Sequence, residues 1–383
     1  MFVNEAEMQR KLSEYARKFG GFSEIVEDHD FYKGTSLEED LIIDAYDYCL
    51  ESLYETVLIT EEENISLFKK EQLKPDFLLF DPGFEKFVIV ELKNEKNATR
   101  QAGTELGAYA NAIKTHFPMI ADTDVVFIVI SSEWPTLLKN YLFNEIFWHK
   151  KKILCLRPIL IESDFLRLEC LPPNILFTNK LQTKFRSNSF SGMQYCIYGK
   201  GIHQGDPIEE LDKHILQVKA SFERIIRKSQ QKNSHGFAFL WKDLRNGTLA
   251  RYSVTFVDIN PFEKFHRQTI EIENDFSEKL YRCISEWGAS GMTGTAIESM
   301  RSGGYFLDSI ANPAPEGAHS WEILKEFMLE RSKLISFKPF GIIADLYEEH
   351  LSRVYAENGS GLQYDDPHFG LAFTEEIMVK EVL

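Results

Sequence analysis

The chain has 383 residues, a formal net charge of −16 at pH 7 and 44% hydrophobic residues, which is enough apolar material for one large or two smaller globular domains and excludes a largely disordered chain. No apolar run approaches the length of a membrane span, and the N-terminus has no basic segment followed by an apolar one, so we expect a cytoplasmic protein with no membrane partner. Its five cysteines show no CxxC spacing, which disfavours a disulfide framework or a zinc site.

The first part of the chain alternates helical and strand-like patterns. After a polar N-terminal segment, apolar residues at helical spacing predict a helix from about residue 37 to 54, which Ser36 and Glu39 begin as a capping box. The elements expected after it are strands at 56–60, 77–80 and 87–90, a helix at 99–114, a strand at 124–131, a helix at 135–148 and a strand at 152–161. This order predicts an α/β fold with a mixed sheet flanked by helices.

The pattern changes beyond about residue 185. Residues 186–206 are rich in Ser, Gly and Gln, and we interpret them as a linker between a first domain at 1–185 and a second at 207–383. Asn246-Gly247 between two apolar runs predicts a β-hairpin. Further helices are expected at 276–287, 320–335 and 342–355. We therefore expect a second, α+β domain that serves recognition, oligomerisation or regulation.

The turn Asp81-Pro82-Gly83 joins two apolar runs and predicts another hairpin. If Phe80 lies opposite Phe87, counting outward places Asp76 opposite Glu91 on the same face of the sheet. Cross-strand partners have Cβ atoms roughly 4.5–5.5 Å apart, and like charges at that separation repel. The pairing therefore predicts a cation between the two carboxylates. Lys93 projects from the same side of its strand as Glu91, and two acids with one lysine suit metal-assisted hydrolysis.

Pro75-Asp76 and Glu91-Leu92-Lys93 resemble the PD-(D/E)XK motif of the restriction-endonuclease-like nucleases, and the element order over residues 37–131 matches the core of that superfamily. The resemblance covers about residues 36–160 and identifies no subfamily. It implies an enzyme that hydrolyses phosphodiester bonds, with DNA as the expected substrate and Mg²⁺, or Mn²⁺ in its place, as the cofactor. Asp76, Glu91 and the backbone carbonyl of Leu92 would hold the metal. Lys93 would position or deprotonate the attacking water. By analogy we also expect a homo-oligomer and a role in phage defence or restriction.

Two further side chains are candidates for this site. Glu38 lies on the apolar stripe of the first predicted helix, so it either faces the sheet as a metal-site acid or simply belongs to an acidic helix N-terminus. Gln101, Glu105 and Tyr109 share one stripe of a later helix. Recombination-type branches of the superfamily carry a QxxxY pair there, whereas this chain has Glu105 four residues before Tyr109. Gln101 and Tyr109 would contact substrate or brace the lysine, or they are a solvated residue and a core-edge aromatic.

Two other functions stay open on the sequence alone. The fold could serve as a non-catalytic module that binds nucleic acid or protein, although a retired site has no reason to keep three charges together. Alternatively, the chain could be a regulated effector whose C-terminal domain senses a ligand or protein trigger. The acidic net charge disfavours unspecific nucleic-acid binding but leaves room for local basic segments such as Lys150–Lys152.

Overall fold

A computed structural model describes residues 5–27, 33–68, 70–93, 99–161, 165–178, 180–181, 183–186, 190–200, 210–259, 274–287, 294–359 and 366–379. The chain divides into two compact units, Met1–Leu181 (unit 1) and Gln182–Leu383 (unit 2). Within these described ranges, no helix is long and apolar enough to cross a bilayer.

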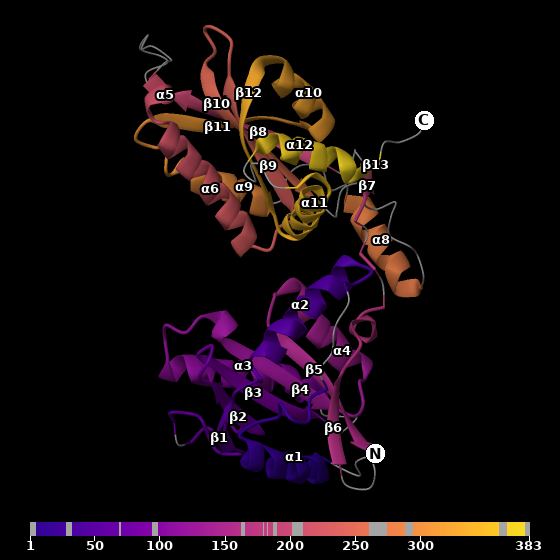
Figure 1. The fold of residues 1–383 in the computed structure, drawn as a ribbon. Helices are drawn as coiled ribbons and strands as arrows, with labels where there is room; N and C mark the ends of the chain where they lie inside the picture. Colours follow the sequence, from indigo (N-terminus) through magenta and orange to yellow (C-terminus); the bar gives the residue numbers. More distant parts are fainter. Residues whose placement is uncertain are drawn as a thin grey trace. The chain divides into compact units, whose positions relative to one another are not determined.

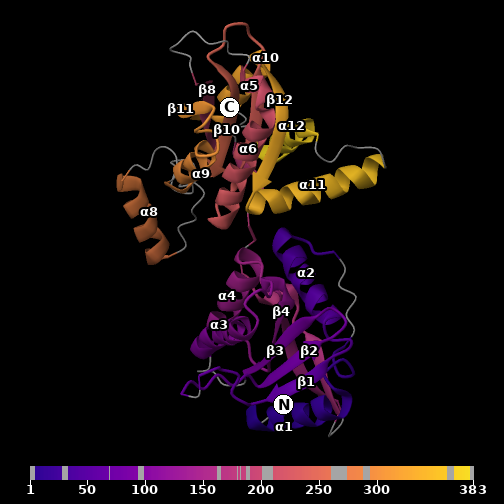
Figure 2. The same ribbon diagram turned by 90° about the vertical axis from the view of Figure 1, so that its left-hand side faces the viewer.

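Unit 1 is built on a mixed sheet, in which the described strands follow the order β1-β2-β3-β4-β5-β6 (Figures 1 and 2). Strands β1 to β3 form an antiparallel meander, β3 to β5 are parallel, and β6 returns antiparallel to β5. The strands are β1 (Val57–Glu61), β2 (Phe77–Asp81), β3 (Lys86–Lys93), β4 (Val125–Ser131), β5 (Ile153–Ile161) and β6 (Phe165–Cys170). The helices are α1 (Glu5–Phe19), α2 (Leu37–Glu51), α3 (Thr99–His116) and α4 (Thr136–Phe143), which continues into a π-helical turn at Asn144–Trp148. The prediction of an α/β fold with a mixed, helix-flanked sheet is confirmed.

The helices of unit 1 cover the sheet because their apolar stripes match its buried faces. Every residue of β4 is buried, as expected for a central strand covered on both faces. Helix α2 packs on β4 and β5, α3 packs on β3, and α1 contacts β1 and β3. Ser36 caps α2 as predicted, but the Glu39 carboxylate accepts hydrogen bonds from Thr35 rather than from Ser36, so the predicted capping box does not close.

Helix α1 was not predicted from the sequence, where residues 5–19 were interpreted as part of a polar segment. Its interior face consists of Met8, Leu12 and Ala16, spaced four residues apart and fully buried. Most of the other positions in this helix are charged. The three-residue apolar stripe was therefore not recognised as a helix signal in the sequence. The stripe is nevertheless sufficient, because most helical stability in proteins comes from packing one face.

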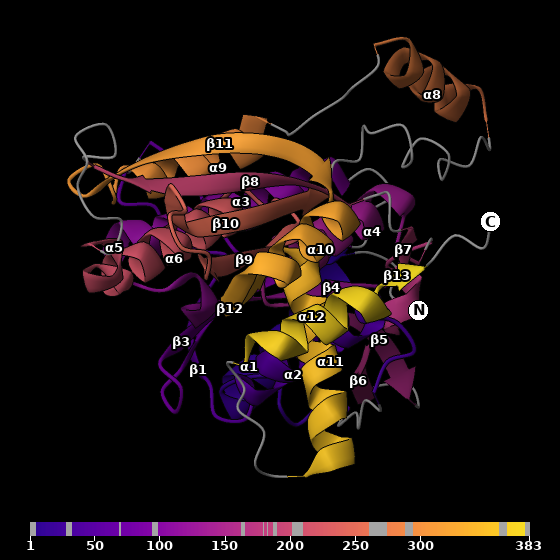
Figure 3. The ribbon, with the colours of Figure 1, turned by 90° about the horizontal axis from the view of Figure 1, so that it is seen from above.

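Unit 2 is built on an antiparallel sheet in which the described strands follow the order β11-β8-β10-β9-β12 (Figure 3). The strands are β8 (Phe190–Gly199), β9 (Gly236–Asp243), β10 (Ala250–Ile259), β11 (Ala311–Ser320) and β12 (Ser332–Phe340), and β7 (Phe185–Arg186) pairs separately with β13 (Met378–Val379). The helices are α5 (Glu210–Lys213), α6 (Ile215–Gln231), α8 (Asp275–Trp287), α9 (Gly294–Gly304), α10 (Trp321–Arg331), α11 (Ile342–Asn358) and α12 (Pro367–Glu376). The hairpin predicted around Asn246-Gly247 is confirmed by the pairing of β9 with β10.

Both faces of the unit 2 sheet are covered. Helices α6 and α9 pack with Ile197, Leu240 and Val254 on one face. On the other face, Phe239 stacks on Trp321 of α10, with ring centroids 4.8 Å apart, and also contacts Phe337 of β12. The sheet is therefore the middle layer of three (Figure 3). The contacts of Phe239 with Trp321 and Phe337 form an aromatic core on the α10 side.

Two predictions for this part of the chain are wrong. The expected linker at 186–206 contains β8, which pairs with both β10 and β11; residues 187–189 and 201–206 lie outside the described ranges. The expected helix at 320–335 ends at Arg331, and Ser332 begins β12. In both places the side chains favour another local structure, and tertiary pairing within the sheet overrides that preference.

We expect Phe77→Ala to lower the free energy of unfolding of unit 1 by about 3–5 kcal/mol, because Phe77 is fully buried and its loss leaves a cavity. Phe84→Ala is the matched control, since Phe84 is 56% exposed, and it should change stability by no more than about 0.5 kcal/mol. Urea unfolding of both variants measures the difference. Equal stability of the two variants would contradict the described core.

Candidate active site

The β2–β3 hairpin brings Asp76 and Glu91 together. The register pairs Phe80 with Phe87 and Phe77 with Val90, as the sequence predicts. One step further outward, the Asp76 carboxylate accepts a hydrogen bond of 2.6 Å from the backbone N–H of Leu92, next to Glu91. This bond holds the first acid against the strand that carries the second.

Glu91 is a buried acid with an incomplete set of partners. Its residue is 4% exposed, and its Oε2 atom has no hydrogen-bond donor among the described residues. Burial, followed by the negative charge of Asp76, raises the pKa of Glu91 to about 9, although Lys93 opposes the shift. A buried carboxylate beside a second carboxylate is the arrangement that a bound cation would stabilise.

Lys93 lies between two carboxylates. Its Nζ atom is 2.6 Å from Glu91 Oε1 and 2.8 Å from Oε2 of Glu105, which is on α3. Burial lowers the pKa of Lys93, but the two carboxylates outweigh burial and raise it above its ordinary value. The Ser131 hydroxyl donates to the Lys93 backbone carbonyl and ties the end of β3 to the end of β4. Lys93 is therefore a positively charged, oriented group at neutral pH.

Two residues from neighbouring helices fix the segment before β2 that carries Asp76. Tyr109 on α3 is buried, and its hydroxyl donates a hydrogen bond of 2.9 Å to the Lys74 carbonyl. Gln9 on α1 donates through Nε2 to the carbonyl of Asp76 at 3.3 Å. Tyr109 was a candidate from the sequence, and the structure gives it a bracing role. Gln9 was missed because α1 itself was missed.

The other candidates contribute differently from what the sequence suggested. Glu38 is buried in the first turn of α2, but its carboxylate accepts from the backbone N–H of Leu181, and none of the interactions described for Glu91 involves it. Helix α2, which carries Glu38, packs on β4 and β5. The side chain of Gln101 lies outside the described residues. Glu105, noted only as a departure from a motif, contacts Lys93 directly.

The donor set fits a hard divalent cation of the magnesium type. Among the described residues, no group of three or more His, Cys, Asp and Glu side chains surrounds a common point, so a zinc-like cage is not formed there. Mg²⁺ commonly binds through only one or two carboxylates and keeps several waters. Glu91 Oε2, which has no hydrogen-bond donor among the described residues, and the neighbouring Asp76 carboxylate would supply these one or two carboxylate ligands. Leu92 lies between Glu91 and Lys93 in β3, and its side chain is fully buried.

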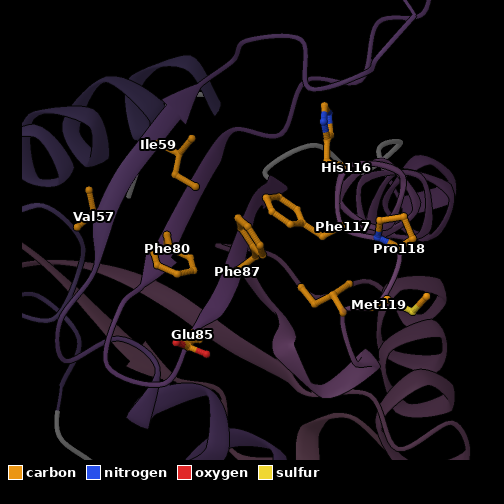
Figure 4. Close-up of a pocket in the computed structure, with 10 residues that line it drawn as sticks. Val57, Ile59, Phe80, Glu85, Phe87, His116, Phe117, Pro118 and Met119 are labelled. Carbon is orange, nitrogen blue, oxygen red and sulfur yellow. The ribbon is translucent and has the colours of Figure 1, made fainter.

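A large apolar pocket of about 790 Å³ lies at the opposite, turn end of the same hairpin (Figure 4). The rings of Phe80, Phe87 and Phe117 line it, with successive centroids 5.3 and 5.2 Å apart. Among its described lining residues, Glu85 and His116 are the ones with ionisable side chains. With one carboxylate and one imidazole among its described lining residues, this pocket has no pair of acids like that of Asp76 and Glu91.

Comparison with protein-family models, with curated proteins and with solved structures finds no match for this chain. The chemistry of the site therefore rests on its own geometry: two adjoining carboxylates, one of them buried, and an ammonium group held beside them.

We expect Asp76→Asn to lower the pKa of Glu91, because it removes the neighbouring negative charge while an amide oxygen can still accept from Leu92. In the wild type, folded Glu91 keeps a proton that the unfolded chain releases, so its contribution to stability falls as pH rises towards about 9. Carboxyl NMR titration measures the shift, with Asp122→Asn, whose side chain is 86% exposed, as the control. Ordinary titration of Glu91 in the wild type would contradict the described geometry.

Proposed function

We propose that this chain is a divalent-metal-dependent nuclease of the PD-(D/E)XK type, which hydrolyses phosphodiester bonds with DNA as the expected substrate. One observation carries the proposal: the β2–β3 register and the Asp76–Leu92 bond gather Asp76, Glu91 and Lys93 at one end of the hairpin. The spacing of the motif in the sequence does not require this convergence. The mixed sheet, with an antiparallel meander followed by a helix and a parallel strand, supports the same proposal.

In this proposal Asp76 and Glu91 would hold Mg²⁺, with the backbone carbonyl of Leu92 as a further ligand. When bound, the ion supplies a polarised phosphate oxygen and a water of lowered pKa. Glu91 must lose its proton to serve as a ligand, and its raised pKa makes that loss dependent on pH. The hydrogen bond from the Leu92 N–H already orients the Asp76 carboxylate. Asp76 therefore does not have to reorient when the metal ion binds.

Lys93 serves in this proposal as a fixed positive charge rather than as a base. Its raised pKa keeps the ammonium group protonated at neutral pH, so it cannot accept a proton from water there. A protonated lysine can instead offset charge that develops on the scissile phosphate and orient the attacking water. Glu105 holds Nζ from the α3 side, so Lys93 keeps one counter-ion when Glu91 is engaged elsewhere.

We expect the wild type to cleave DNA in the presence of Mg²⁺ or Mn²⁺, and Asp76→Ala and Lys93→Ala to reduce the rate by about 10²-fold or more, because each removes a group that acts on the reacting phosphate. Lys70→Ala is the matched control, since Lys70 is an exposed lysine of the same unit. Cleavage of labelled single-stranded and duplex DNA measures the rates. If all four proteins show the same rate, the site assignment is wrong, and if Mg²⁺ binds without any cleavage, the non-catalytic binding module is favoured.

Metal binding itself is expected to stabilise the folded chain, independently of turnover. Mg²⁺ should raise the melting temperature of the wild type, and more strongly at pH 8 than at pH 6, because Glu91 releases its proton more readily at the higher pH. Glu91→Gln should abolish the increase, whereas Asp122→Asn should preserve it. Differential scanning calorimetry measures both. An increase that survives in Glu91→Gln would place the ion elsewhere.

A further inference from the structure

The apolar pocket at the turn end of the β2–β3 hairpin is open to water and is not used by the nuclease proposal. Strands β2 and β3 supply its middle, β1 one side and the segment after α3 the other (Figure 4); these residues are, in the same order, Phe80, Phe87, Val57, Ile59, Phe117 and Met119. Ile59 is 48% exposed, Phe117 52% and Met119 96%. Contiguous exposed apolar surface of this kind typically marks a binding site, and we refer to it as the β1 groove.

The β1 groove lies where one face of the sheet lacks a helix. Helix α3 packs on β3, and Phe87 of β3 contacts Phe117 just beyond α3 on the face of the groove. The opposite face is covered there, because Phe77, three residues before Phe80, is fully buried and contacts Phe22 after α1.

The uncovered face has room for one more helix. Strand β1 is two positions from β3 in the sheet, which corresponds to about 10 Å at the usual strand spacing. Packed helices lie roughly 8–10 Å apart, so a helix over β1 and β2 would lie beside α3 at an ordinary packing distance.

The charge beside β1 is negative. Residues 55–63, which contain β1, include four glutamates and no lysine or arginine. One of these acids, Glu61, pairs with Arg17 at 2.9 Å. Four exposed carboxylates in this region form no hydrogen bond or ion pair with another described residue: Glu55, Glu62, Glu63 and Glu85.

Glu85 is the acid that lines the β1 groove itself. Its backbone φ of 56° is a left-handed conformation in which glycine or asparagine is more usual, so the chain keeps a carboxylate here at a conformational cost. The next residue, Lys86, points to the other face, with Nζ 3.6 Å from the centre of the Tyr48 ring. Lys114, near the other side of the groove, pairs with Asp122. The charge next to the groove is therefore predominantly negative.

We propose that the β1 groove binds an amphipathic helix of a partner protein, with an apolar stripe over Phe80 and Phe87 and with lysine or arginine side chains on its flanks. The stripe would bury the exposed apolar side chains, and the basic flanks would pair with acids such as Glu85. A second copy of this chain suits the groove less well, because a two-fold contact would bring the same acids together. The groove is at the turn end of the hairpin, and its role does not depend on the nuclease proposal.

Fluorescence anisotropy of the full chain with two labelled synthetic helices tests the proposal. One probe is an amphipathic helix of leucine and lysine, and the other carries glutamate in place of every lysine. We expect saturable binding of the lysine probe and an affinity about tenfold or more lower for the glutamate probe, because the acids beside the groove repel it.

Two variants locate this binding on the chain. Ile59→Lys should weaken binding of the lysine probe about tenfold or more, because it replaces apolar contact with a repelling charge. Ile323→Lys is the matched control, since Ile323 is 55% exposed on α10 and acquires the same charge. Glu85→Gln should weaken binding about threefold, whereas Glu357→Gln, at an exposed acid of α11, should leave it unchanged.

Four results would overturn the proposal. The first is the absence of saturable binding of the lysine probe, and the second is equal affinity for the two probes. The third is wild-type affinity in both Ile59→Lys and Glu85→Gln. The fourth is a dimer in sedimentation velocity that Ile59→Lys dissociates, which would assign the groove to a second copy. Melting temperatures measured without probe establish that each variant is folded.

Discussion

The register between β2 and β3 is the constraint on which the candidate site depends. Successive side chains of a strand point to opposite faces, so a slip of one residue would turn Glu91 and Lys93 away from Asp76. The turn sets this register, because the Asp81 carboxylate accepts from the backbone N–H groups of Gly83 and Phe84 at 2.9 and 3.2 Å. Buried apolar side chains on both strands then penalise any alternative pairing.

Charge balance is the second requirement of the site. Two acids next to each other at the edge of a core would repel, and one of them has little access to water. The chain places Lys93 against this pair and then adds Glu105 on the far side of the lysine. The result is a row of acidic and basic side chains in which Glu91 Oε2 still lacks a hydrogen-bond donor among the described residues. Such a row can exchange a proton for a cation without rebuilding the surrounding core.

The sequence predicted the β2–β3 hairpin better than it predicted several other parts of the fold. The hairpin was predictable because a strong turn signal lies between two short apolar runs, and the pairing of Asp76 with Glu91 followed from counting. The contacts made by Gln9 and Glu105 were not predictable, because they depend on where α1 and α3 pack rather than on local pattern. In unit 2, β8 contains Ser, Gly and Gln, and β11 contains two prolines, which suit an edge strand but give no apolar alternation to detect.

The bonds that hold Asp76 in place use main-chain atoms of the residues around it. Tyr109 binds the carbonyl of residue 74, and Asp76 itself binds the N–H of residue 92. Every amino acid offers that carbonyl, and every amino acid except proline offers that N–H. Because the side chain at position 74 is exposed and takes no part in this bond, a substitution there should not move the Asp76 carboxylate. Position 92 tolerates any apolar substitute that fills the same space.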